Sequence, residues 1–272
     1  MNWLLQKIEM EGDIYGMRLN KGKCEYLRFG SAGNVNFRDG VKVPPVQHVK
    51  YLGCQLNERG DPGTEIIGRI KHCMTLLTKL HLFFKYGDCD PAKKILVWNA
   101  VIRSKLMYGL ESTVMNKSVL NRLDSFQMKT LRKILHRPTT YIDRTFSHAK
   151  LISEANTAIS GEQTGKVILL SELHKQQRIK LLAKLIVLGD DEPSAVVTFT
   201  HSLQQHEYGK RRVGRPRLNW LQVTREDLWC DIKSKAAQWR WAGKLDLTRD
   251  DHHAAIRDYA VHLNQKHAWT HR

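Results

Sequence analysis

The spacing of hydrophobic residues along the chain changes near residue 63. Between residues 14 and 57, apolar positions alternate with polar ones over short stretches, which is the pattern of strands with one buried face. The turn at Arg38–Gly40 separates two such alternations and predicts a hairpin. Residues 24–29 and 49–56 each predict a further short strand. The early part of the chain therefore predicts a small antiparallel sheet.

Helical periodicity governs the rest of the chain. Apolar residues recur at the 3.6-residue spacing of an α-helix after residue 63, and residues 1–12 have the spacing of the end of a helix. Asp61 and Asp90 precede helical stretches as N-cap residues, and Pro91 follows Asp90 at the first helical position. The expected helices span residues 64–85, 91–110, 118–136, 171–188, about 193–204, 217–233 and roughly 249–265.

These patterns predict an α+β fold that is mostly α. The small antiparallel sheet in residues 1–60 is followed by a helical segment in residues 61–152. Residues 153–170 are mostly polar and small, so we interpret them as a linker. Residues 171–272 form a second helical region.

The charge of the chain narrows the class of partner. The 272 residues contain 44 Lys and Arg against 27 Asp and Glu, a formal net charge of +17. Residues 61–150 have a balance of +9, against +3 for residues 1–60 and +5 for residues 151–272. Such an excess indicates a polyanionic partner, and DNA and/or RNA is the simplest one.

An anionic membrane is the rival partner, but the sequence argues against it. The longest apolar stretch, residues 95–110, is interrupted by Asn99, Arg103 and Lys105, so it is too short and too polar to span a bilayer. No lipidation motif or signal peptide is recognisable. The five cysteines are an odd number in no pairing pattern, which suits a reducing compartment. We therefore expect an intracellular protein with no membrane partner.

A basic face on the expected helix 118–136 is the first candidate site. Its cations recur near one side of the helix, while Leu123 and Leu131 belong to an apolar side. Such a helix can follow a phosphate backbone; the alternative is a solvated face, as on most charged helices. The candidate residues are Arg122, Lys129, Arg132 and Lys133.

The basic run Lys210–Trp220 is the second candidate site. A Gly-Arg-Pro core flanked by arginines suits an A·T-rich minor groove, although Val213 stands where an arginine is expected. The run also fits a nuclear-import signal, or a basic loop before a helix that Trp220 and Leu221 anchor. The candidate residues are Arg211, Arg212, Arg215 and Arg217.

Two acidic pairs superficially resemble metal ligands. Asp190–Asp191 and Asp250–Asp251 stand where helices are expected to begin, and acidic residues are common in that position. His72, Cys73 and Cys89 lack the spacing of zinc ligands. We therefore predict that the chain on its own has no metal site and no cofactor.

Several stretches occur in the order and approximate spacing of known motifs. GMRLNKGKCEYLRF (residues 16–29) has the form of a polymerase palm motif D with Cys24 in place of the usual Thr, and VKYLGCQL (49–56) contains the KYLG core of motif E. Further matching stretches are EIIGRIKHC (65–73), VIRSKLMYGLES (101–112), LDSFQMKTLRKIL (123–135), LLAKLIVLGDDEPSAVV (181–197) and GKRRVGRPRLNWLQVTREDL (209–228). Together they resemble the C-terminal half of the reverse transcriptases of non-LTR (LINE-type) retrotransposons.

The resemblance implies a role for each segment. Residues 1–60 correspond to the end of the palm, residues 61–152 to the helical thumb, and residues 171–272 to a basic C-terminal region. Lys23 matches a motif D lysine that lies near the phosphates of the incoming nucleotide. Motif E is the primer-grip hairpin. For its Lys50 and Tyr51, a primer role and a core-strand role both stay open, whereas we expect Leu52 in the core.

The resemblance also bears on activity. The parent enzymes are RNA-directed DNA polymerases. Their palm carboxylates, which include the aspartates of a YADD turn, hold two Mg²⁺ ions. The matching residues of this chain begin after that turn, so we expect a reverse transcriptase fragment that binds nucleic acid. It would have no catalytic residue, no small-molecule substrate and no polymerase activity of its own. The alternatives are the C-terminal portion of an active enzyme with a truncated gene model, and a non-functional translated relic. The oligomeric state is left open.

Overall fold

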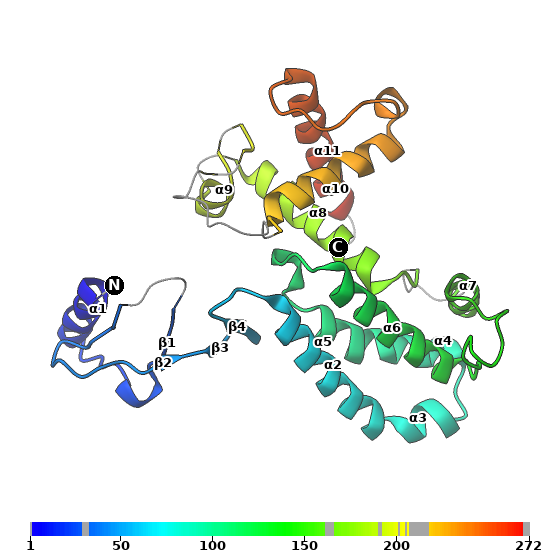
Figure 1. Ribbon diagram of the computed structural model, residues 1–272, viewed down its shortest axis with the longest axis horizontal. Helices are drawn as coiled ribbons and strands as arrows, with labels where there is room; N and C mark the ends of the chain where they lie inside the picture. The colour runs from blue at the N-terminus through cyan, green and yellow to red at the C-terminus, as the bar shows by residue number, and fades with distance from the viewer. Residues whose placement is uncertain are drawn as a thin grey trace. The chain divides into compact units, whose positions relative to one another are not determined.

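The computed structural model describes residues 2–28, 33–160, 166–189, 192–200, 202–204, 206 and 218–268 (Figure 1). Side chains are described up to residue 265. The chain divides into two compact units, residues 1–68 and residues 69–272. The described residues are mostly helical with a few short strands, so the expected α+β fold that is mostly α is confirmed.

The first unit combines one helix with two small strand pairs. Its first strand pair is parallel and its second is antiparallel. The helix at the start of the chain confirms the helical pattern in residues 1–12. The elements in chain order are α1 (Asn2–Ile14), the 3-10 turn η1 (Lys21–Lys23), β1 (Tyr26–Leu27), β2 (Pro45–Val46), β3 (His48–Tyr51) and β4 (Cys54–Asn57).

The strand β1 differs from the strand expected over residues 24–29 in length and in partner. It has two residues, and it pairs with β2 in parallel, so the expectation of a wholly antiparallel sheet is wrong here. Pro44, whose carbonyl accepts the N–H of Tyr26 at 3.2 Å, has no N–H to donate to β1 in return, which limits the length of the pair. The expected hairpin at Arg38–Gly40 is confirmed by the antiparallel bridge between Asn36 and Lys42.

The stretch expected as one strand over residues 49–56 is a hairpin. Lys50 pairs with Gln55 across β3 and β4. The two residues of the turn, Leu52 and Gly53, have φ angles of +47° and +85°, which is the left-handed backbone of a tight hairpin turn. Leu52 is 73% exposed at this tip, so its expected place in the core is wrong.

The first unit has little core of its own. Phe37 and Val43, from the two arms of the first hairpin, are 1% and 4% exposed. By contrast, α1 contains no buried residue, and its Trp3 and Ile14 are 71% and 72% exposed. A helix of this length is marginal in water without packing, so α1 gains little stability from the described residues.

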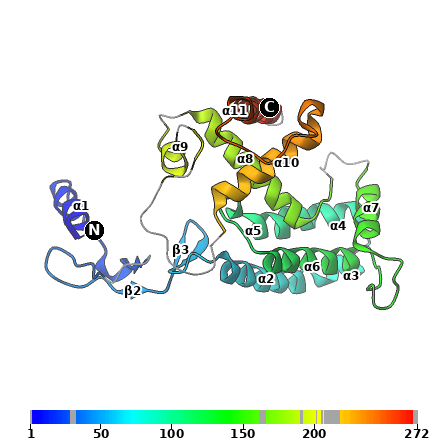
Figure 2. The ribbon, with the colours of Figure 1, turned by 45° about the horizontal axis from the view of Figure 1, so that its top comes forward.

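The second unit is helical (Figures 1 and 2). The two expected N-caps are confirmed, because the side chains of Asp61 and Asp90 each accept a backbone N–H from two residues further on at 3.0 Å. The elements are α2 (Pro62–Lys79), which begins in the first unit, α3 (His81–Tyr86), α4 (Pro91–Trp98), the π-helical turn η2 (Asn99–Arg103), α5 (Ser104–Met107), η3 (Leu110–Ser112), α6 (Lys117–Ile134), α7 (His148–Ala158), α8 (Leu170–Leu188), α9 (Pro193–Thr198), α10 (Trp220–Lys235), η4 (Ala237–Trp239) and α11 (Asp250–Ala268).

Three of the expected helices are shorter or interrupted. The helix expected over residues 64–85 breaks at Leu80, between α2 and α3. The helix expected over residues 91–110 passes through η2 and ends before Gly109, whose φ of +66° ends the regular helix. The helix expected over residues 193–204 stops at the end of α9. The other expected helices are confirmed with small changes at their ends.

The segment expected as a linker, residues 153–170, is partly helical. Its first six residues belong to α7, in which Leu151 and Ala155 are fully buried. The Asn156 side chain then exchanges two hydrogen bonds with the backbone of Val167, at 2.7 and 3.0 Å. The small, polar composition hides an apolar stripe, so composition alone misplaces the end of the preceding helical segment. Residues 161–165 lie outside the described residues.

The long helix α8 joins two groups of helices within the second unit (Figure 2). It contacts α6 and η3 as well as α10 and α11. Its buried residues lie on several sides of the helix, as expected for a central element. The core that it shares with α10 and α11 includes Leu182, Leu228 and Ile256, all of which are completely buried.

Candidate nucleic-acid interface

The helix α6 exposes a line of cations. Arg122, Lys129 and Lys133 are exposed, and their spacing of seven and four residues puts them on one face of the helix. The opposite side packs into the core through residues such as Leu123 and Leu131, which are completely buried. The helix starts sharply because the Asn116 side chain accepts the N–H of Val119 at 2.9 Å. The packing of the core therefore fixes which side chains of α6 face solvent.

Arg132 does not belong to this line, which corrects the expectation from sequence. It is 8% exposed, and its guanidinium points under the loop that follows α6. Its Nε donates to the carbonyl of Pro138 at 3.2 Å and its Nη2 to the carbonyl of Phe146 at 3.1 Å. The side chain holds backbone carbonyls and cannot contact a phosphate in this position.

Other cations of the second unit are also turned inward. Lys94 is 4% exposed, and its Nζ donates to the carbonyl of Phe84 at 3.2 Å. Arg178 pairs with Asp227 at 2.6 Å, and Arg69 donates to carbonyls at the end of α5. Buried carbonyl and carboxylate oxygens need such donors. Part of the positive charge of the chain therefore stabilises the fold and is not available to a partner.

The second candidate site, the basic run, falls on residues that the structure does not describe. Its four candidate residues, Arg211, Arg212, Arg215 and Arg217, lie outside the described residues. The helix that follows is confirmed together with its anchors. Trp220 Nε1 donates to the carbonyl of Glu111 at 2.8 Å, and Leu221 is 4% exposed. The basic run therefore leads into a helix start that is fixed to the turn before α6.

The candidate residues of the first unit are exposed. Lys23 ends η1, while Lys50 and Tyr51 lie at the end of β3, next to the hairpin tip. Tyr51 is 62% exposed, which does not fit a place in the core. All three side chains are accessible to a ligand.

Sequence reasoning missed Lys21, two residues before Lys23. Its ammonium pairs with the carboxylate of Asp39 and lies 5.2 Å from the centre of the Phe37 ring. The hydrogen bond from Lys21, together with the N–H of Val41, lowers the pKa of Asp39. Lys21 thus links η1 to the first hairpin. Its partner is 18 residues away in the sequence, so no local pattern marks it.

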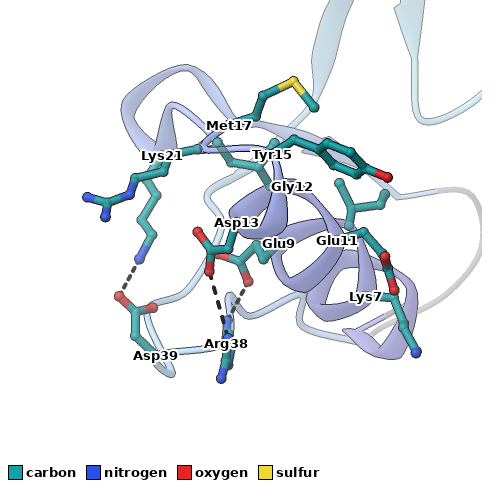
Figure 3. A pocket seen from close by; sticks show the side chains of 13 residues that line it. Lys7, Glu9, Glu11, Gly12, Asp13, Tyr15, Met17, Lys21, Arg38 and Asp39 are labelled. Atoms are coloured by element: carbon teal, nitrogen blue, oxygen red, sulfur yellow. Dashed lines mark hydrogen bonds and ion pairs between the residues drawn. The ribbon is translucent and has the colours of Figure 1, made fainter.

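A cavity of about 1230 Å³ lies beside these residues in the first unit, between α1, η1 and the turn at Arg38 (Figure 3). Asp13 pairs with Arg38 at 3.8 Å, and Glu9 accepts the backbone N–H of Arg38 at 2.7 Å. The cavity is lined by four cations and four carboxylates, whose charges balance, so it does not attract a polyanion. The charged lining residues are Lys7, Glu9, Glu11, Asp13, Arg18, Lys21, Arg38 and Asp39.

The acidic pairs behave as parts of helix starts where they are described. Asp250 and Asp251 form the first turn of α11, and Asp251 pairs with Arg249 at 2.6 Å. Asp190 and Asp191 lie outside the described residues. Among the residues that are described, no group of three or more His, Cys, Asp or Glu side chains is placed to hold a metal ion.

Within the described part of the chain, no helix combines the length and apolar composition that crossing a bilayer requires. Comparisons with protein-family models, with curated proteins and with solved structures found no match to this chain.

Proposed function

We propose that this chain binds nucleic acid non-specifically through the exposed face of α6. The observation that carries the proposal is the line of Arg122, Lys129 and Lys133 on a helix whose other side is buried. With a rise of about 1.5 Å per residue, this line is roughly 16 Å long. Each strand of a duplex carries one charge about every 3.4 Å of the helix axis, so a backbone offers enough phosphates along this length to meet all three cations.

We further propose that the chain is the end of the palm and the thumb of a reverse transcriptase of the non-LTR type. The ordered motifs in residues 16–228 support this assignment. The exposed positions of Lys23, Lys50 and Tyr51 leave them accessible to a nucleotide or a primer. In this assignment α6 belongs to the thumb, which would contact the backbone of a template–primer duplex.

The motif assignment raises the question of whether the chain binds nucleic acid, extends a primer, or does both. We propose that these 272 residues alone bind nucleic acid without extending a primer, because they include no counterpart of the YADD carboxylates that hold the two metal ions. Purified chain should not extend a primer on an RNA template with Mg²⁺ and dNTPs. Template-dependent extension above a no-protein control would contradict this. A YADD turn encoded in frame upstream would instead support the alternative that the chain is the C-terminal portion of an active enzyme.

For location, we propose an intracellular and nuclear protein. The basic run Lys210–Trp220 supplies the composition of an import signal. Fusion of this run to a fluorescent reporter should concentrate the reporter in the nucleus, and alanine at Arg211 and Arg212 should abolish that effect. An unchanged distribution of the reporter would refute the nuclear part of the proposal.

A pair of charge-matched variants tests the binding surface. K129A/K133A removes two exposed cations four residues apart on α6, and K180A/K184A removes two with the same spacing on α8. Binding to a blunt duplex should weaken with salt, with a slope of about −0.9 per phosphate contacted. The α6 variant should flatten that slope by up to about two units, whereas the α8 variant should change it little. Equal effects of the two variants would mean that net charge, and not α6, drives binding. No binding of the unmodified chain at low salt to duplex DNA, single-stranded DNA or RNA would refute the proposal.

A further inference from the structure

The loop between α6 and α7, residues 135–147, is an unusual surface feature of the second unit. Arg132 holds it from below, because its guanidinium donates to the carbonyls of Pro138 and Phe146 at opposite ends of the loop. A buried side chain therefore ties the two ends of the loop to α6 and to each other.

The tip of the loop is fixed by its own hydrogen bonds. The carbonyl of Thr139 accepts the N–H groups of Ile142 and Asp143, both at 3.0 Å. The carboxylate of Asp143 accepts the hydroxyl and the N–H of Thr145 at 2.7 and 2.8 Å, and these bonds lower the pKa of Asp143. The backbone on either side of Tyr141 is thus constrained before any partner binds.

This constrained tip holds two apolar side chains in solvent. Tyr141 is 96% exposed and Ile142 is 76% exposed. Tyr141 is among the most exposed large side chains of the described chain, and burial of an aromatic ring is strongly favourable. A rigid loop that presents a free ring is pre-organised to bind a flat apolar partner.

Positive charge surrounds the loop. Arg137 and Lys150 lie 5.3 and 4.6 Å from the centre of the Phe146 ring, and Arg137 also pairs with Glu154. Arg144 is exposed three residues after Tyr141. Residues 129–150 include six Lys and Arg against one Asp. An aromatic ring among exposed cations is suited to bind a polyanion that also carries planar groups able to stack on the ring.

We propose that this loop binds single-stranded nucleic acid, with Tyr141 stacking on an unpaired base and Arg144 and Lys150 contacting the phosphates beside it. The proposal rests on the nucleic-acid binding proposed above, and it adds the form of the ligand. In the interior of a duplex both faces of each base are already stacked, so away from duplex ends an exposed ring has a stacking partner only where bases are unpaired. Lys129 and Lys133 of α6 lead along the helix to the loop, so one backbone can follow both.

An anionic membrane is the competing partner for an apolar tip among cations. The geometry favours nucleic acid, because the tip offers only two neighbouring apolar side chains, whereas exposed cations continue beyond the loop along α6. Membrane binding strength rises with the apolar area buried in the bilayer, and two side chains supply only a small area. The Tyr141 variants described next separate nucleic acid from a membrane as the partner.

The test compares Tyr141→Ala, Tyr141→Phe and the control Tyr108→Ala, which removes another exposed tyrosine of the second unit. Affinities for a labelled oligo(dT) and for a blunt duplex are measured by fluorescence anisotropy. Tyr141→Ala should weaken oligo(dT) binding about 5- to 150-fold, the range for loss of one stacking side chain, and should change duplex binding less than about twofold. Tyr141→Phe, which keeps the ring, and Tyr108→Ala should bind like the unmodified chain.

Three outcomes would overturn the inference. If the unmodified chain binds oligo(dT) and Tyr141→Ala binds it equally well, the stacking role is wrong while the proposed function stands. If Tyr141→Ala loses binding to phosphatidylserine vesicles and keeps binding to oligo(dT), the loop is a membrane contact. If the unmodified chain binds neither oligo(dT) nor duplex, the proposed function fails and this inference fails with it. Circular dichroism should be unchanged in Tyr141→Ala, because the side chain makes almost no packing contact.

Discussion

The side chain of Gln127, in the middle of α6, caps the first turn of α8 by accepting the backbone N–H of Leu170 at 3.0 Å. Its amide N–H₂ donates to the carbonyl of Ile168 at 2.7 Å, so one buried amide satisfies both a donor and an acceptor. The residue at the N-cap of α8, Leu169, has no side chain that can do this. A residue 43 positions earlier therefore helps to fix where the central helix begins, together with Asp124, whose carboxylate accepts the N–H of Ser171 at 2.9 Å.

Replacement of Gln127 with Ala should destabilise the second unit by about 2–3 kcal/mol. Leu170 is completely buried, and the variant would leave its N–H and the Ile168 carbonyl without partners, each at a cost of about 1–3 kcal/mol before relaxation. Urea unfolding followed by tryptophan fluorescence measures the change. The control is Gln176→Ala on the exposed side of α8, for which we expect less than about 0.5 kcal/mol. Equal destabilisation by the two variants would contradict the capping role.

Acid should destabilise the second unit through His174. Burial, aided by the neighbouring Arg178, lowers the pKa of His174 to about 4 in the folded chain. Its Nε2 lies 3.0 Å from the carbonyl of Leu110. The unfolded chain takes up a proton near pH 6.5, before the folded chain does, so this stabilisation is complete above about pH 6.5 and declines as the pH falls toward 4.

The loss through His174 amounts to up to about 3 kcal/mol at pH 4 relative to pH 7. The free energy of unfolding, measured in urea at several pH values, should therefore fall more steeply for the unmodified chain than for His174→Gln. The comparison isolates His174 from the other groups that titrate in this range. Parallel pH profiles for the two proteins would show that His174 is not the responsible group.

Hydrogen exchange should separate weakly from strongly protected segments. Residues 14–56 bury few side chains, and the described strands β1 and β2 leave open edges. Residues 64–150 contain the buried faces of α4 and α6. Mass-spectrometric exchange should give the longest-lived protection in residues 64–150. Equal or greater protection in residues 14–56 would mean that the short strands have a stabilising partner, such as a second copy of the chain.

The basic run should contribute to duplex binding through its arginines. R215A/R217A should lower affinity and flatten the salt dependence by up to about two units if both side chains contact phosphate. A preference for A·T-rich duplex that disappears in this variant would support the minor-groove interpretation. The charge-matched control is again K180A/K184A. An identical salt slope for R215A/R217A and the unmodified chain would leave the run as a loop before α10.

Local signals in the sequence were sufficient for most of the helices and for some turns. Asp90 followed by Pro91 marks the start of α4, because the carboxylate caps a free N–H and proline needs none. The alternation around residues 38–40 marks a hairpin because turn residues and strand period both act over a few residues. The same holds for α6, where the apolar stripe repeats within one helix.

Only the tertiary structure decided which polar side chains are available to a partner. Arg132 and Lys133 are adjacent and chemically alike, yet one holds the loop after α6 and the other faces solvent. The difference depends on the carbonyl of Phe146, 14 residues after Arg132, so the spacing of charges on α6 does not encode it. Likewise, the parallel pairing of β1 with β2 and the cap that Gln127 gives to α8 join segments distant in sequence. A side chain's free energy depends on the groups that surround it after folding, and those groups are set by the packing of the whole unit.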